Sequence, residues 1–189
     1  MAINEGNLAA LIGSRLCHDL VSPLGAIGNG LELMQMMQAP TPEMDLVDAA
    51  VKVAQTRLRL FRLAFGVATE DQTVDAIELT EALKSLGANG RITVKTDFTA
   101  TLARTNARRL ALAALCVETA LAWGGDIDVT TSGVSASAAR FKFDPALWAT
   151  LSQGDTMANP VSATVHFAIL AATGPVAVHA TDTGLWLTV

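Results

Sequence analysis

The chain has 189 residues, of which 51% are apolar and 16% are charged, with a formal net charge of −5. This composition is typical of a globular protein with a filled core and excludes a disordered chain. The basic residues form no dense block, so nucleic acid is not an expected partner. No uninterrupted apolar run is long enough for a membrane span. The N-terminal stretch lacks a basic leader with a cleavage site, and we therefore expect a cytoplasmic protein.

The first third of the sequence predicts a pair of antiparallel helices joined by a short turn. Residues 7–38 form the first helix, because their apolar side chains recur at steps of three and four. This apolar row, which we expect to face the partner helix, consists of Leu16, Leu20, Leu24, Ile27, Leu31 and Met34. Pro40 ends the first helix. A second helix begins near Pro42, with Thr41 as its N-cap and with Glu43 and Asp45 in its first turn.

The second helix has a regular apolar row of its own. Its members are Met44, Val47, Val51, Ala54, Leu58, Phe61 and Phe65. Further apolar side chains lie off this row, at Val53, Leu60, Leu63 and Val67. Two helices cannot enclose a core by themselves, so this extra surface needs cover from the rest of the chain or from a second copy. A homodimer that forms a four-helix bundle is the economical prediction.

A histidine lies on the outer face of the first helix. His18 is about 160° from the centre of the apolar row at 100° per residue. Small or polar residues share its face, namely Ser14, Ser22, Gly25 and Asn29. Small neighbours around an exposed imidazole leave room for another protein to approach. Asp19 follows directly and can accept a hydrogen bond from the ring or help move its proton.

Two further neighbours of His18 bear on this interpretation. Pro23 lies inside the helix, where proline costs about 3 kcal/mol, which indicates a helix not shaped for stability alone. Cys17 precedes the histidine, but adjacent helical positions point about 100° apart. We therefore interpret Cys17 as a packed residue and not as half of a catalytic pair. Taken by itself, His18 could also be an ordinary surface residue.

The run from His18 to Leu24, HDLVSPL, resembles the H-box of two-component histidine kinases. In that box an acidic residue follows the phosphorylated histidine, and proline stands five positions on. The longer stretch HDLVSPLGAIGNGLELM is similar to the ChpT-type histidine phosphotransferases of alphaproteobacteria. The resemblance implies that His18 is the phosphoacceptor and Asp19 its acid/base neighbour. It makes Arg15 a contact for an acidic partner and places Ser22 where kinases carry threonine or asparagine.

The resemblance also implies a relay function in cell-cycle control. Such a protein accepts a phosphoryl group from the receiver domain of a hybrid sensor kinase and passes it to response regulators. We expect no cofactor on this chain, and Mg²⁺ on the partner receiver domain. The expected catalytic residues are His18 and Asp19, and the expected partner-binding residues are Ser14, Arg15, Ser22, Gly25 and Asn29.

Residues 1–68 would thus form a helical hairpin for dimerisation and phosphotransfer, and residues 69–189 predict an α+β domain. In this domain we expect helices on one side of a mostly antiparallel sheet. The expected helices are 77–86, 106–123, 145–151 and 161–173, and the expected strands are 91–98, 126–131, 138–143, 176–180 and 185–189. We expect Trp123, Trp148 and Trp186 in the core, and His166 and His179 to be ordinary residues of helix or strand.

The order of elements in this second domain resembles the ATPase domain of histidine kinases. The stretch Leu115–Ala122 matches the kinase N-box, but leucine and threonine stand where kinases have asparagines. The glycine-rich motifs that let a backbone approach phosphates are absent. We therefore expect a degenerate domain that does not bind ATP. Two alternatives stay open: a non-catalytic docking module for receiver domains, and an active histidine kinase with an unusual nucleotide site.

Overall fold

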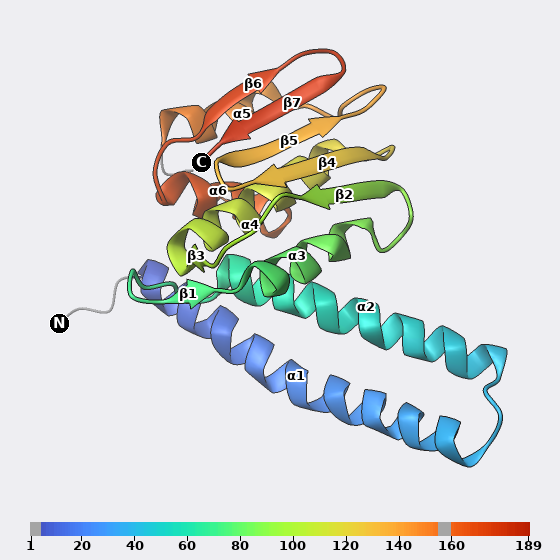
Figure 1. Cartoon of the computed structure of the whole chain (residues 1–189). Helices are drawn as coiled ribbons and strands as arrows, with labels where there is room; N and C mark the ends of the chain where they lie inside the picture. The colour runs from blue at the N-terminus through green and yellow to red at the C-terminus, as the bar shows by residue number, and fades with distance from the viewer. Residues whose placement is uncertain (1–4, 155–159) are drawn as a thin grey trace. The chain divides into compact units, whose positions relative to one another are not determined.

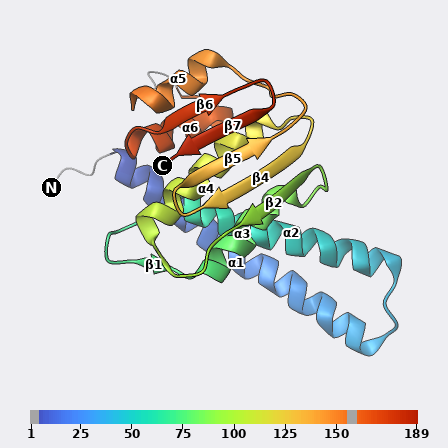
Figure 2. The ribbon, with the colours of Figure 1, turned by 45° about the horizontal axis from the view of Figure 1, so that its top comes forward.

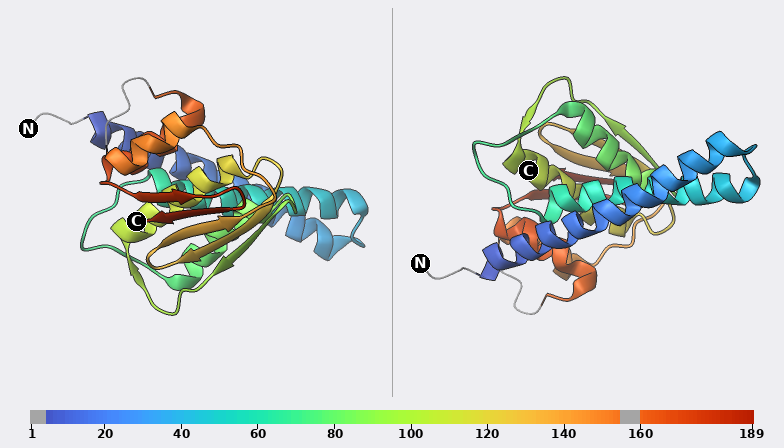
Figure 3. Two further views of the ribbon diagram at one scale, coloured as in Figure 1. Left: turned by 90° about the horizontal axis from the view of Figure 1, so that it is seen from above. Right: turned by 90° about the horizontal axis from the view of Figure 1, so that it is seen from below.

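The computed structural model describes residues 5–154 and 160–189, and the chain divides into two compact units between Val67 and Ala68. The first unit consists of α1 (Glu5–Met37) and α2 (Pro42–Phe65), which run antiparallel, side by side (Figure 1, Figure 3). The second unit contains a five-stranded sheet and its helices. The predicted α+β class, a helical hairpin followed by an α/β unit, is confirmed.

The start of α2 follows from its local sequence. The Thr41 hydroxyl accepts a hydrogen bond from the Met44 backbone N–H at 3.3 Å, which satisfies one of the free donors of the first turn. Pro42 occupies the first helical position, and Glu43 and Asp45 lie in the first turn, as predicted. Hydrogen bonds within the capped turn lower the pKa of the Glu43 carboxyl.

The side of α1 that contacts α2 differs from the prediction. Of the six apolar residues expected to face α2, Leu31 is buried and Leu24 is half-buried. The other four are exposed in the single chain, namely Leu16, Leu20, Ile27 and Met34. These four residues are called the exposed apolar row below. They lie about 60–100° around the helix from Cys17, which is buried.

Glycines explain which side of α1 meets α2. A Cβ on Gly13 would lie 3.2 Å from the Phe65 carbonyl oxygen, and a Cβ on Gly28 would lie 3.4 Å from Gln55 Nε2. Gln55 also donates a hydrogen bond from Nε2 to the Leu24 carbonyl oxygen at 3.2 Å. The two helices therefore approach most closely along a row of small residues, and the larger apolar side chains lie beside that contact.

The sheet of the second unit has the strand order β2–β4–β5–β7–β6. β2 pairs with β4 in parallel, and every other pair is antiparallel. The strands are β2 (Ile92–Thr96), β4 (Gly125–Thr130), β5 (Gly133–Ser137), β6 (Ala177–Ala180) and β7 (Gly184–Thr188), and a separate antiparallel pair is formed by β1 (Thr73–Val74) and β3 (Leu102–Ala103). The helices are α3 (Ala76–Lys84), α4 (Arg104–Ala120), α5 (Pro145–Gln153) and α6 (Val165–Ala172), with 3₁₀ turns at Ser85–Gly87 and Ser162–Thr164.

This sheet has one covered face and one open face. Helices α4, α5 and α6 lie behind its strands in Figure 1; in Figure 2, α4 and α6 are again behind the strands and α5 appears above them. Side chains alternate along each strand, so Ile127 and Val129 of β4 are buried while Asp126 and Asp128 are exposed. The core of this unit therefore lies between the sheet and the three helices, as expected for an antiparallel sheet covered on one side.

One predicted strand is misplaced. The sequence predicts a strand at 138–143, whereas β5 spans Gly133–Ser137. Both neighbours of β5 end their pairing at Ser137, which lies opposite Asp126 of β4 and Gly184 of β7. Without a partner strand on either side the chain leaves the sheet, and the Lys142 N–H then donates a hydrogen bond to the Ala120 carbonyl oxygen. The other predicted elements of this unit are confirmed, with shifts at their ends.

The expectation that all three tryptophans lie in the core is wrong for two of them. Trp148 is buried, stacked on Phe143 and edge-on to Phe167 with ring centroids 5.0 Å apart. Trp123 and Trp186 are 54% and 44% exposed. Trp123 follows the end of α4, and Trp186 points to the open face because its neighbours in β7 point to the covered one.

Candidate functional site

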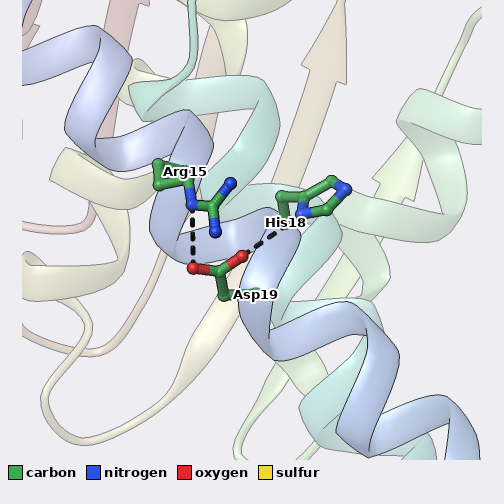
Figure 4. A network of polar contacts seen from close by, with 3 residues as sticks. All are labelled: Arg15, His18 and Asp19. Carbon is green, nitrogen blue, oxygen red and sulfur yellow. Dashed lines mark hydrogen bonds and ion pairs between the residues drawn. The ribbon is translucent and has the colours of Figure 1, made fainter.

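His18 projects from α1 with 80% of its side chain exposed. Its Nδ1 lies 3.3 Å from Oδ1 of Asp19, and Oδ2 of Asp19 accepts a hydrogen bond from Arg15 Nε at 2.9 Å. Figure 4 shows the Asp19 carboxylate between the two other side chains. One carboxylate thus connects a guanidinium and an imidazole on the surface of a single helix.

Helix geometry produces this cluster. Arg15 and Asp19 are four residues apart and therefore neighbours on the helix surface. Arg15, expected to meet an acidic partner, meets an acidic residue of its own helix. An exposed ion pair of this kind stabilises a helix by only about 0.3–0.5 kcal/mol. Its main consequence is that the Asp19 carboxylate is held in an orientation that also reaches His18.

The Asp19 carboxylate lies on the Nδ1 side of the His18 ring. A carboxylate beside Nδ1 favours the neutral tautomer that carries its hydrogen on Nδ1. The lone pair then lies on Nε2, and the ring extends away from the helix (Figure 4). An exposed imidazole with a free lone pair on Nε2 can act as a nucleophile toward an electrophile brought by another molecule.

The other predicted site residues lie in different surroundings. Ser14 is half-buried, and its hydroxyl accepts a hydrogen bond from the Val67 N–H at 3.4 Å. Ser22 and Asn29 are exposed, and neither side chain has a hydrogen bond to any residue in the described ranges. A Cβ added to Gly25 would meet nothing within 4 Å. The helix surface following His18 is therefore open, whereas Ser14 already takes part in the hairpin.

Two exposed apolar side chains near His18 were not singled out from the sequence. Leu11 lies seven residues before His18, and Val21 lies three residues after it. These spacings place both on the same side of α1 as the histidine. Their side chains are exposed. The same spacing argument that selected Ser14 and Asn29 could have found them, had apolar residues been considered.

Cys17 takes no part in this cluster. It is buried although its neighbour His18 is exposed. Burial raises the pKa of the Cys17 thiol, and nearby Arg62 partly offsets that rise. A buried thiol with a raised pKa is a poor nucleophile, so the interpretation of Cys17 as a packed residue is confirmed.

Neither a metal-binding cluster nor a membrane-spanning helix is found among the described residues. Within residues 5–154 and 160–189, no three His, Cys, Asp or Glu side chains gather in a way that could hold a metal ion. None of the helices described in the structure is both long enough and apolar enough to cross a bilayer.

The stretch that was compared with the kinase N-box is mostly buried in the core of the second unit. Leu115, Cys116 and Val117 of α4 are buried. The Thr119 hydroxyl donates a hydrogen bond to the Cys116 carbonyl oxygen of its own helix at 2.7 Å. At the positions where kinases carry asparagines, this helix therefore has an apolar side chain and a hydroxyl already engaged by the backbone.

The chain is similar to known phosphotransferases. The protein phosphotransferase ChpT of Brucella abortus (strain 2308) is 47% identical over 62 residues, which cover 33% of this chain and 30% of that protein. A solved structure described as a bacterial phosphotransferase matches 100% of this chain and 98% of its own with a TM-score of 0.66; at 21% identity this shows the fold. The family model of the histidine phosphotransferase C-terminal domain matches residues 77–177, more than half of the chain. The chain therefore belongs to the histidine phosphotransferase family.

Proposed function

We propose that this chain is a relay phosphotransferase whose phosphoryl carrier is His18. The group arrives from a phosphorylated aspartate in the receiver domain of a hybrid sensor kinase and leaves to the receiver domains of response regulators. The observation that carries the proposal is an exposed imidazole whose Nδ1 faces a carboxylate held by Arg15. Membership of the histidine phosphotransferase family supports it.

The transfer step needs little from this chain beyond the imidazole and Asp19. Nε2 of His18 attacks the phosphorus atom, and an N–P bond forms while the bond from phosphorus to the donor carboxylate oxygen breaks. The donor aspartate leaves with the electron pair as a carboxylate. The ring keeps its hydrogen on Nδ1 and gains positive charge, which Asp19 stabilises. Onward transfer reverses these steps on a second receiver domain.

The remaining charge is met by the partner in this proposal. Mg²⁺ bound to the receiver domain would neutralise the phosphoryl oxygens during transfer. No cofactor is proposed on this chain, and ATP binding is not part of the reaction. The buried residues of α4 at the N-box positions and the missing glycine-rich motifs support a domain without nucleotide.

The surface around His18 suits a docked receiver domain. Gly25 leaves open space and Ser22 and Asn29 are unengaged among the described residues, so a partner backbone can come close to the helix. Leu11 and Val21 offer apolar contact area on the same side. A short-lived complex needs this mixture of a few apolar contacts and adaptable polar groups.

We also propose that the chain works as a homodimer through the exposed apolar row of α1. Each member of the row lies roughly 160–180° around the helix from His18. A second copy can therefore cover the row, completing a four-helix bundle, while both histidines stay accessible to partners. Uncovered, the row would expose four large side chains to water on one face of a helix.

The deciding experiment mixes the purified chain with a receiver domain that carries radiolabelled phosphoryl aspartate. We expect acid-labile, base-stable label on the wild type and on His179→Ala, whose substituted histidine is equally a surface residue. We expect none on His18→Ala. Label on His18→Ala would contradict the proposal. Binding of the receiver without label on the wild type would instead favour a docking module, and label from ATP alone would favour a kinase.

A further inference from the structure

The two exposed tryptophans of the second unit differ in what covers them. The Trp123 ring carries a cation of its own chain, because Arg140 Cζ lies 3.9 Å from the ring centroid. Trp186 has no cation over its ring within the described part of the chain, and its ring neighbour is His179, with centroids 5.3 Å apart. The Trp123 ring is thus stacked against an arginine of its own chain, whereas one surface of the Trp186 ring is exposed on the open face of the sheet.

The Trp186 ring is held in place before any partner arrives. Gly184 lies two residues earlier on the same face of β7, and a Cβ there would overlap the indole ring. The ring therefore lies back across its own strand, in space that only glycine leaves free. His179 is directly opposite in β6 and supports the ring from the neighbouring strand. Tryptophan is among the residues that most often carry binding energy at protein interfaces.

A hollow adjoins this ring on the open face. It has a volume of about 150 Å³ and lies across β4, β5 and β7. Asp128, Ser135 and Trp186 are consecutive partners in the strand register, so the carboxylate and the indole flank the small serine from opposite sides. The two flanking residues are two strand spacings apart, roughly 10 Å. Because Ser135 and Gly133 have small side chains or none, the space between Asp128 and Trp186 stays open.

Two carboxylates of β4 lie on this part of the face. Asp126 and Asp128 are exposed, and neither has a hydrogen bond or ion pair to any residue that the structure describes. Lys95 in β2 is the lateral partner of Asp128, and His179 lies in β6 beside Trp186. A carboxylate and an aromatic surface on two sides of one hollow are complementary to a planar cation.

We propose that this hollow binds an arginine side chain presented by a protein partner. The guanidinium stacks on Trp186, as that of Arg140 does on Trp123, and donates hydrogen bonds to Asp128. Arginine suits the site better than lysine, because its planar group can stack on the ring and reach the carboxylate at once. This surface belongs to the second unit alone and is independent of phosphotransfer at His18.

The test is an NMR titration of the full chain with the tripeptide acetyl-Gly-Arg-Gly-amide at low salt. A matched peptide contains citrulline, which has the shape of arginine without its charge. We expect saturable shifts of the Trp186 indole N–H and the Ser135 amide with the arginine peptide, at a dissociation constant on the order of 1 mM. The citrulline peptide should bind at least about 5-fold more weakly.

Variants make the result specific to the hollow. Trp186→Ala and Asp128→Asn should each weaken binding at least about 5-fold, and Trp123→Ala should leave it unchanged. All three substituted residues are exposed, which favours an intact fold, and an unchanged amide spectrum of the core would verify it. Equal shifts with both peptides, unchanged binding by Trp186→Ala, or shifts confined to Trp123 would each overturn the proposal.

Discussion

Helix α1 of the hairpin and helix α4 of the second unit differ in how much of their apolar surface is buried. In α4 and α6 of the second unit several large side chains are fully buried, among them Leu110, Leu112, Phe167 and Leu170. In the hairpin, large apolar side chains remain exposed along α1, from the exposed apolar row to Met36 and Met37. A unit that completes its own core has no need of partners for stability. A unit that leaves such surface uncovered is suited to contacts with other chains.

The largest contrast should appear in stability. Phe167→Ala removes a fully buried ring that packs against Trp148, and we expect it to lower the free energy of unfolding of the second unit by about 3–5 kcal/mol. Met37→Ala at an 87% exposed position should change the free energy of unfolding by less than about 0.5 kcal/mol. Urea unfolding followed by tryptophan fluorescence measures the first, and circular dichroism the second. Similar losses for both variants would break the contrast.

The next effect concerns association. Ile27→Glu places a charge in the exposed apolar row, and we expect the dimer dissociation constant to rise on the order of 100-fold or more, because the carboxylate would be buried without a partner. The matched variant is Leu33→Glu, at a residue that is also exposed but lies outside the row. Sedimentation equilibrium measures both. A monomeric wild type, or equal effects of the two variants, would refute the proposed interface.

A smaller effect separates catalysis from binding. Asp19→Asn removes the negative charge beside Nδ1 of His18, and we expect the rate of phosphoryl transfer to fall about 100-fold. The affinity for the receiver domain should change little. The control is Asp48→Asn, which removes a carboxylate that also pairs with a basic residue of its own helix, Lys52 on α2. Rapid-quench kinetics give the rates, and an unchanged rate in Asp19→Asn would remove the proposed role of the carboxylate.

The smallest effect is expected at Arg15. Arg15→Gln leaves Asp19 and His18 in place but frees the carboxylate from its ion pair. We expect transfer to slow by about 3-fold, in line with the modest energy of an exposed pair. The double variant Arg15→Gln/Asp19→Asn should be no slower than Asp19→Asn alone. A further loss in the double variant would mean that Arg15 contacts the partner directly.

Much of the hairpin was predictable from local patterns. Features that depend on neighbouring residues can be predicted directly from the sequence. In the hairpin these are the apolar spacing of three and four, the turn at Pro40, the Thr41 cap and the first turn of α2. The outward position of His18 was predictable for the same reason. The contact of Arg15 with Asp19 also follows from their spacing of four, although the resemblance assigned Arg15 to an acidic partner and Asp19 to His18.

The α+β class, the hairpin, the exposure of His18 and the carboxylate beside it follow from the sequence alone, because each depends on residue periodicity or on adjacent residues. Which row of α1 meets α2 depends on packing, since two rows overlap and close approach at Gly13 and Gly28 selects between them. The end of β5 at Ser137 also depends on packing, since both neighbouring strands stop pairing there. The support of the Trp186 ring by His179 likewise depends on the pairing of β6 with β7, which neither strand's sequence states by itself.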